Sequence, residues 1–187
     1  KGVLTGLTEI SEIISSKKIN GEVVQCDGEL YYRGIDVNTL ITGFINDNRF
    51  GFEETTYLLL FGKLPTNEEL KEFEDLLASY RTILPKNFVR DIIMKKPSED
   101  LMNNISRAIL NLYAYDSNPN DLSIPNVLRQ SLELIAIFPM LAVYSYHAKN
   151  YYLDKGSLII HRPKANLSTA ENILYMLRPD HKYTELE

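Results

Sequence analysis

Apolar residues recur at helical spacing through most of this chain, and that periodicity most constrains its fold. Leu70, Phe73, Leu77 and Tyr80, for example, fall on one face of a helix. Helices are predicted over residues 37–44, 52–61, 67–81, 85–96, 98–116, 122–150 and 167–178. Pro139 lies inside the longest of these segments and is expected to kink it or split it in two. The chain is therefore predicted to be mainly α.

Capping boxes mark several helix starts, because a Ser or Thr followed three residues later by Glu can satisfy two free backbone N–H groups. The pairs are Thr66 with Glu69, Ser168 with Glu171, and Thr184 with Glu187. Ser98 is expected to cap the segment that follows it, with Asp100 in the positive first turn. The pair at Thr184 stands at the end of the sequence, so we expect a helix to follow residue 187.

The only strand-like segments lie before residue 35. The stretches VVQC and ELYY flank Asp27-Gly28 and predict a two-residue hairpin turn there. The predicted organisation is an N-terminal β-hairpin region over residues 1–34 and a helical part over residues 35–187.

Composition excludes several classes of protein. The net charge of -5 and the pI of about 5.3 disfavour a nucleic-acid binder. Cys26 is the single cysteine, so an internal disulfide is impossible and a reducing, cytoplasmic location is expected. The most apolar run is interrupted by Glu133 and Pro139, and neither a membrane-spanning helix nor a signal peptide is expected.

Few side chains carry a recognisable chemical pattern. His147, His161 and His181 are widely spaced and are interpreted as surface or structural residues, because metal-ligand spacing is absent. Asp27 beside Cys26 opposes thiolate formation. Four glutamates lie largely on the polar side of an amphipathic helix and are expected to be a solvated face: Glu68, Glu69, Glu72 and Glu74.

Arg33 in the stretch YYRG leaves two interpretations open. Its guanidinium could hold a carboxylate or phosphate through two hydrogen bonds. It could instead tie the hairpin to the helices. No catalytic, cofactor-binding or metal-binding residue is predicted within the chain.

Four stretches that span nearly the whole chain form a recognisable series. They are GELYYRGIDVNTLI, FEETTYLLLFGKLPTNEEL, LELIAIFPMLAVYSY and AENILYMLRPDHKYTELE. Together and in this order they resemble the N-terminal part of the citrate synthase large domain, and NISRAILNLYAYD is similar to the anaerobic bacterial branch. One departure is KPSEDLM, which stands where many members have a His-Pro-Met.

The resemblance implies a multi-helical large-domain fragment with a small N-terminal β-hairpin. The family condenses acetyl-CoA with oxaloacetate to citrate and CoA in the tricarboxylic acid cycle, without a metal or other cofactor. An aspartate removes a methyl proton while a histidine stabilises the enolate. The family's G-P-x-H-G-G-A-N loop is absent from residues 1–187, so the resemblance implies an active site that lies later in the protein and a fragment inactive alone.

The resemblance also implies a homodimer, with segments 51–61 and 98–115 matching the subunit interface. An arginine that helps bind the CoA phosphate in some members lies upstream of the matched region, so that role is not transferred. Two alternatives remain: a 2-methylcitrate synthase that takes propionyl-CoA, and a non-catalytic helical module that binds partners.

Overall fold

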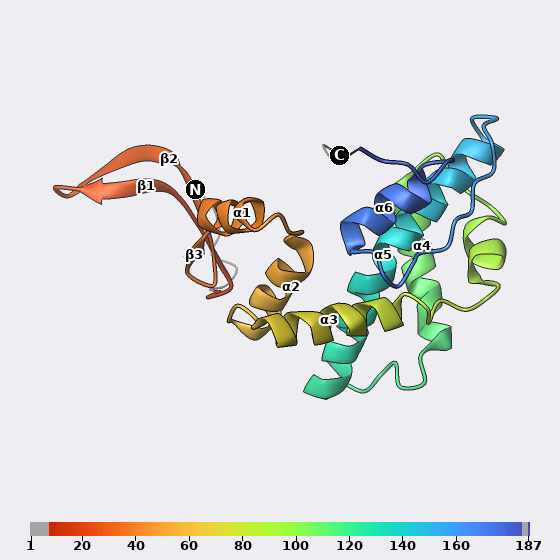
Figure 1. The fold of residues 1–187 in the computed structure, drawn as a ribbon, viewed down its shortest axis with the longest axis horizontal. Coiled ribbons are helices and arrows are strands. Elements are labelled where there is room, and N and C mark those ends of the chain that lie inside the picture. The colour runs from red at the N-terminus through yellow and green to blue at the C-terminus, as the bar shows by residue number, and fades with distance from the viewer. Residues whose placement is uncertain (1–7, 185–186) are drawn as a thin grey trace. The chain divides into compact units, whose positions relative to one another are not determined.

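The computed structural model describes residues 8–184 and 187, which divide between two compact units, residues 1–73 and 74–187 (Figure 1). Helices dominate, and the only sheet among the described residues has three strands. The prediction of a mainly α chain with a small N-terminal hairpin is confirmed. The domain division at residue 34 stays a prediction.

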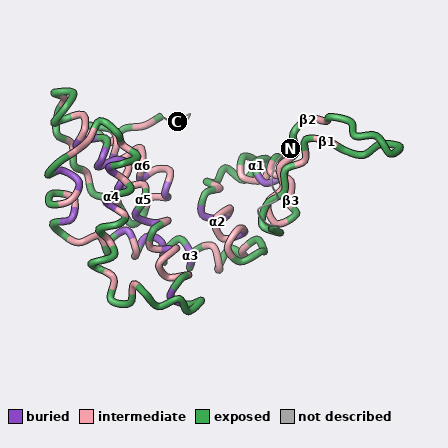
Figure 2. Tube along the Cα trace, turned by 180° about the vertical axis from the view of Figure 1, so that it is seen from behind, coloured by how far each residue is buried: buried purple, intermediate pink, exposed green. Residues whose placement is uncertain are grey.

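The first unit contains an antiparallel sheet with strand order β1-β2-β3, followed by helices. Its elements are β1 (Ser11–Ile19), β2 (Glu22–Tyr32), β3 (Ile35–Asp36), α1 (Val37–Asn46), α2 (Phe52–Phe61) and the start of α3 (Asn67–Tyr80). β1 and β2 form an arm whose residues are mostly exposed, drawn green in Figure 2.

The hairpin turn lies at Asn20-Gly21, so its predicted position at Asp27-Gly28 was wrong. Asn20 and Gly21 both have positive φ, 52° and 90°, as a type I′ turn requires. Gly28 is not among the glycines with positive φ, and it lies inside β2. Both dipeptides satisfy the same sequence rule, and the choice between them depends on which pairing gives two long strands.

Asp27-Gly28 instead belongs to a bulge in β2. Ile14 pairs with Glu29 and Ser16 pairs with Gln25, so residues 26–28 oppose a single residue of β1. A bulge of this kind leaves residues unpaired and bends its strand. It is the one irregularity in the pairing of β1 with β2.

The predicted starts of the next three helices and the end of α2 are confirmed, while α1 continues two residues beyond its predicted end. The side chain of Asp36 accepts a hydrogen bond from the N–H of Thr39 at 3.0 Å and caps α1. α2 ends at Gly62, whose φ of 77° is the left-handed conformation expected of a C-terminal glycine. Thr66 and Glu69 form both hydrogen bonds of a capping box at the start of α3, at 2.9 and 3.2 Å.

The second unit is built around a long helix. Its elements after α3 are η1 (Val89–Ile93), α4 (Leu101–Leu112), η2 (Tyr113–Tyr115), α5 (Ile124–Tyr152) and α6 (Thr169–Leu177). α4 and α6 both contact α5, and the buried core lies among them. The core includes Phe88, Ala108, Met140, Leu141, Tyr144 and Met176.

The start of α4 differs from the prediction. Asp100 is the N-cap, because its carboxylate accepts from the N–H of Asn103 at 3.1 Å. The hydroxyl of Ser98 accepts from the N–H of Asp100 and forms a turn before the helix. Met102 on α4 is 71% exposed, while Ala108 is buried. The predicted helix over 85–96 is reduced to the five residues of η1.

α5 continues through Pro139, so this proline does not split the helix. The unbroken helix is long and apolar enough to cross a membrane by length and composition alone, contrary to the prediction. The core helix of a soluble protein meets the same criteria. Met140, Leu141 and Tyr144 of this helix are buried in the core of the second unit.

Asn172 joins α6 to the irregular segment before it. Its side chain is buried, accepts from the N–H of Lys164 at 2.8 Å, and donates to the carbonyls of Lys164, Leu167 and Ser168 at 3.0, 2.9 and 3.1 Å. The predicted capping box of Ser168 and Glu171 forms at the start of α6.

The final capping box also forms. The N–H of Thr184 donates to Glu187 at 3.0 Å, and the N–H of Glu187 donates to the hydroxyl of Thr184 at 3.3 Å. Arg178 pairs with the same glutamate. The helix expected after residue 187 stays a prediction.

Candidate functional site

The contacts of Arg33 support the interpretation that this residue ties the hairpin to the helices. Arg33 and Gly34 have positive φ, 49° and 79°, and form the turn between β2 and β3. The Arg33 Nε and Nη2 atoms donate to the carbonyl oxygen of Leu59 in the last turn of α2, at 3.1 and 2.8 Å. The guanidinium therefore ties the sheet to a helix within the first unit.

Cys26 and the glutamates of α3 show no arrangement that suggests catalysis. Cys26 is half-buried in the bulge of β2. Glu69 is engaged in the capping box and pairs with Lys63 at 2.6 Å, while Glu68 and Glu72 are exposed. These glutamates cap the helix and form part of its solvated face.

The three histidines, far apart in sequence, gather around the C-terminal end of α6. His147 Nε2 lies 3.1 Å from the carbonyl oxygen of Met176. His161 Nε2 lies 3.3 Å from that of Pro179, and His181 Nδ1 lies 3.2 Å from that of Tyr175. Carbonyls at the end of a helix lack intrahelical partners, so His147 and His181 are placed to satisfy two of them, while His161 contacts a carbonyl just beyond the helix.

Two of these histidine rings are in contact with each other and with a tyrosine. The His181 ring stacks on Tyr175 at 4.2 Å and lies tilted against His161 at 3.8 Å, measured between centroids. His147 is 2% exposed, and burial lowers its pKa. Among the described residues no group of three or more His, Cys, Asp or Glu side chains is arranged to hold a metal ion. The structure thus gives the histidines a structural role at the end of α6.

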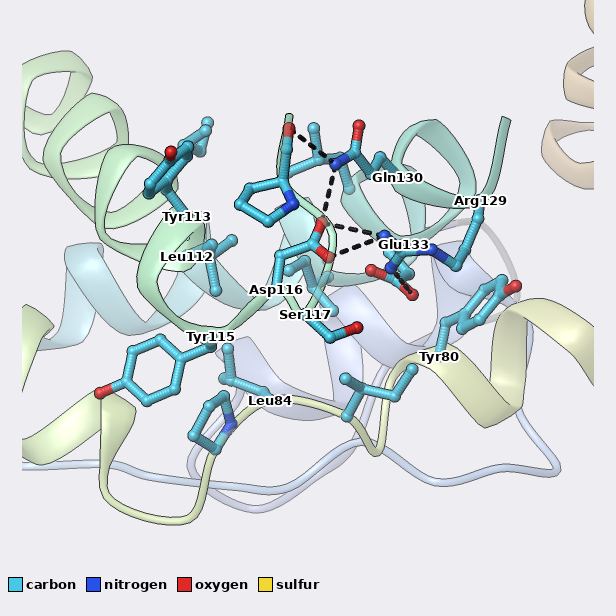
Figure 3. A pocket seen from close by; sticks show the side chains of 16 residues that line it. Tyr80, Leu84, Leu112, Tyr113, Tyr115, Asp116, Ser117, Arg129, Gln130 and Glu133 are labelled. Atoms are coloured by element: carbon cyan, nitrogen blue, oxygen red, sulfur yellow. Dashed lines mark hydrogen bonds and ion pairs between the residues drawn. The ribbon is translucent and has the colours of Figure 1, made fainter. Parts of the chain in front are cut away.

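A cavity of about 430 Å³ lies within the second unit, among the loop after α3, the C-terminal part of α4, η2 and the N-terminal half of α5 (Figure 3). Its wall is largely apolar and includes Ile83, Leu84, Leu112 and Ile137. The rings of Tyr80, Tyr113 and Tyr115 also line it. This size falls in the range of small-molecule sites.

One end of the cavity is polar and is organised by Arg129. Its Nη2 atom donates to both carboxylate oxygens of Asp116, at 2.8 and 3.0 Å, and its Nη1 atom donates to Glu133 Oε1 at 2.8 Å. The Nε and Nη2 atoms also donate to the side chain of Asn126, at 3.0 and 2.8 Å. All three guanidinium nitrogens are therefore engaged.

Asp116 is held as a carboxylate. The backbone N–H of Asn118 donates to it at 2.8 Å and the side chain of Gln130 at 2.7 Å. These donors, with Arg129, lower its pKa. The charged groups that line the cavity are two carboxylates and one guanidinium, giving a formal charge of -1. The site favours a neutral or cationic ligand over an anion.

Arg129, Asp116 and Glu133 were not predicted as site residues. Asp116 lies in a polar loop 13 positions before Arg129, so nothing in the sequence indicates that these two meet. Arg129 and Glu133 are four residues apart on one helix, and that spacing was the one available signal.

Comparison with known proteins identifies the family. The family model described as "Citrate synthase, C-terminal domain" matches residues 1–187. The chain belongs to the citrate synthase family. Citrate synthase of Corynebacterium glutamicum is 29% identical over 171 residues, which are 88% of this chain and 36% of that protein. 2-Methylcitrate synthase 1 of the same organism is 27% identical over 176 residues, 94% of this chain and 40% of that protein.

The fold agrees with this assignment. Citrate synthase from Pyrobaculum aerophilum superposes with a TM-score of 0.68 at 24% identity, over 94% of this chain and 40% of that one. The chain therefore spans between about a third and two fifths of the length of the citrate synthase relatives it matches.

Proposed function

We propose that this chain is part of a citrate synthase that condenses acetyl-CoA with oxaloacetate to give citrate and CoA. The match of the family model to all 187 residues is the observation that carries the proposal. The proposal places the protein in the tricarboxylic acid cycle and in the cytoplasm, with no cofactor beyond its acyl-CoA substrate.

The catalytic groups are proposed to lie outside residues 1–187, because the family's G-P-x-H-G-G-A-N loop does not occur here. In that case these residues serve as a scaffold. The test is release of CoA from acetyl-CoA and oxaloacetate. The full-length enzyme is expected to turn over and the 187-residue polypeptide is not. Turnover by the polypeptide alone would contradict this placement.

A second candidate is condensation of propionyl-CoA, as the name of 2-methylcitrate synthase 1 from Corynebacterium glutamicum suggests. One added methylene changes discrimination by only about 1–3 kcal/mol, so the two activities are close. Comparing kcat/KM for acetyl-CoA and propionyl-CoA on the full-length enzyme separates them. The first substrate is expected to be preferred.

The enzyme is proposed to be a homodimer, with α4 contributing to the interface. Met102 and Leu110 on this helix are 71% and 75% exposed, and Tyr113 just beyond it is 58% exposed. Met102 and Leu110 are eight residues apart and share a face of the helix. An exposed apolar row of this kind is typical of a surface covered by a partner.

A further inference from the structure

The polar end of the cavity has a carboxylate oxygen left over. Glu133 uses its Oε1 atom to accept from Arg129, and among the described residues nothing donates to its Oε2 atom. Arg129 already forms ion pairs with Asp116 and Glu133, so its positive charge is balanced before any ligand enters. A ligand that enters the cavity therefore meets a carboxylate oxygen that can accept and a guanidinium that is already paired (Figure 3).

The remainder of the wall suits an apolar body next to a cation. Ile83, Leu84, Leu112 and Ile137 are apolar, and the rings of Tyr80, Tyr113 and Tyr115 complete the lining. Aromatic rings attract cations through their faces, and the effect grows when the cation is desolvated. The formal charge of -1 on the groups that line the cavity also attracts a cation. A phosphorylated or carboxylated ligand would face repulsion with no free basic group to offset it.

We propose that this cavity binds a small monocationic amine with an apolar or aromatic body, its ammonium group directed to Glu133. The proposal does not rest on the condensation activity. It depends only on the charge, the size and the free acceptor of a cavity that lies wholly within the second unit. The volume of about 430 Å³ accommodates a single ring with a short side chain.

The test compares two probes of similar shape and opposite charge on the full-length enzyme. 2-Phenylethylamine is protonated at pH 7, and 3-phenylpropionate is its anionic counterpart. Binding is followed by saturation-transfer NMR and titration calorimetry. The amine is expected to bind and the carboxylate is not. Equal binding of both probes, stronger binding of the carboxylate, or no binding of the amine at millimolar concentration would overturn the proposal.

Two variants locate the binding. Glu133→Gln keeps the shape and removes the charge, and it is expected to weaken amine binding about tenfold. Ile83→Trp places a large ring at a half-exposed wall position and is expected to block the cavity without disturbing the core. Glu99→Gln, an exposed glutamate that does not line the cavity, is the matched control. Amine binding that both cavity variants leave unchanged would assign the amine to another site.

Discussion

Arg33 and Leu59 are joined by two hydrogen bonds from one guanidinium to one carbonyl oxygen, at 3.1 and 2.8 Å. The carbonyl belongs to the last turn of α2, where no further N–H of the helix can reach it. A cation at this end of a helix also interacts favourably with the negative pole of the helix dipole. Arg33 thus acts as a C-terminal cap supplied by a turn of the sheet.

Replacing Arg33 with Ala is expected to lower the free energy of unfolding by about 1–2 kcal/mol, because a charge-assisted hydrogen bond to a helix end is lost. Arg33→Lys keeps a charge but not the two-nitrogen geometry, so a smaller loss is expected. Neither alanine nor lysine favours positive φ, so backbone strain stays similar in all three proteins. Urea unfolding measures the difference.

The matched control is Arg90→Ala. Arg90 pairs only with its neighbour Asp91 among the described residues, and its side chain is 69% exposed. Its loss is expected to change stability much less than Arg33→Ala does, because solvent screens an exposed ion pair. An Arg33→Ala effect as small as this control would show that the contact with Leu59 contributes nothing.

Asn172→Asp tests the buried amide that holds α6 to residues 164–168. The change is isosteric, but it replaces an NH₂ group that donates to backbone carbonyls with an oxygen. A loss of at least about 2 kcal/mol is expected at pH 7. Burial raises the pKa of the introduced carboxyl, so the folded state binds its proton more tightly and the loss shrinks as pH falls toward about 5.

The control for this change is Asn111→Asp on the exposed face of α4. Urea midpoints at pH 7 and pH 5 are measured for both variants and for the unmodified protein. A penalty at Asn172 that is constant with pH would contradict the assignment of its NH₂ group as the essential donor.

The burial of His147 predicts that the free energy of unfolding depends on pH. Burial lowers its pKa from the ordinary value of 6.5, so the unfolded chain binds a proton more readily than the folded one. Its contribution is present above pH 6.5 and is lost as pH falls from there toward the folded pKa. His147→Gln can still donate to the carbonyl of Met176 and does not titrate. The fall in unfolding free energy between pH 7.5 and 5.5 is expected to be smaller in this variant, and identical slopes would refute the role of His147.

Substitution of Met102 and Leu110 tests the proposed dimer. Replacing both with Lys puts charge on an exposed apolar face and is expected to shift the full-length enzyme toward monomer in sedimentation velocity. Glu72→Lys, at an exposed polar position of α3, is expected to leave the assembly unchanged. A double variant that sediments like the unmodified enzyme would remove α4 from the interface.

Local signals in the sequence were sufficient where a few neighbouring residues decide the structure. The capping boxes at Thr66, Ser168 and Thr184 all form, because each needs only a hydroxyl and a carboxylate three residues apart. The pairing of strands, which depends on residues farther apart in the sequence, was harder to predict. Asp27-Gly28 and Asn20-Gly21 satisfy the same turn rule, and only strand pairing selects the second.

The site residues show the same limit. His147, His161 and His181 are widely spaced in the sequence, and their gathering at α6 depends on the packing of α5 against that helix. Asp116 meets Arg129 across 13 positions of sequence, through a loop whose path no local pattern predicts. Tertiary packing, rather than propensity, determines both arrangements.

The bulge in β2 carries a consequence for how the length of the exposed arm can change. Three residues, 26–28, oppose one on β1, so the pairing shifts by two positions between Ile14 and Ser16. Two positions are one full period of side-chain alternation, and the residues on both sides of the bulge keep their faces. Removing Asp27 and Gly28 together would leave an ordinary hairpin with every other side chain on its present face. Removing either one alone would leave two residues opposite one, a smaller bulge that changes the local alternation and twist. Insertions and deletions in pairs should therefore disturb this arm least.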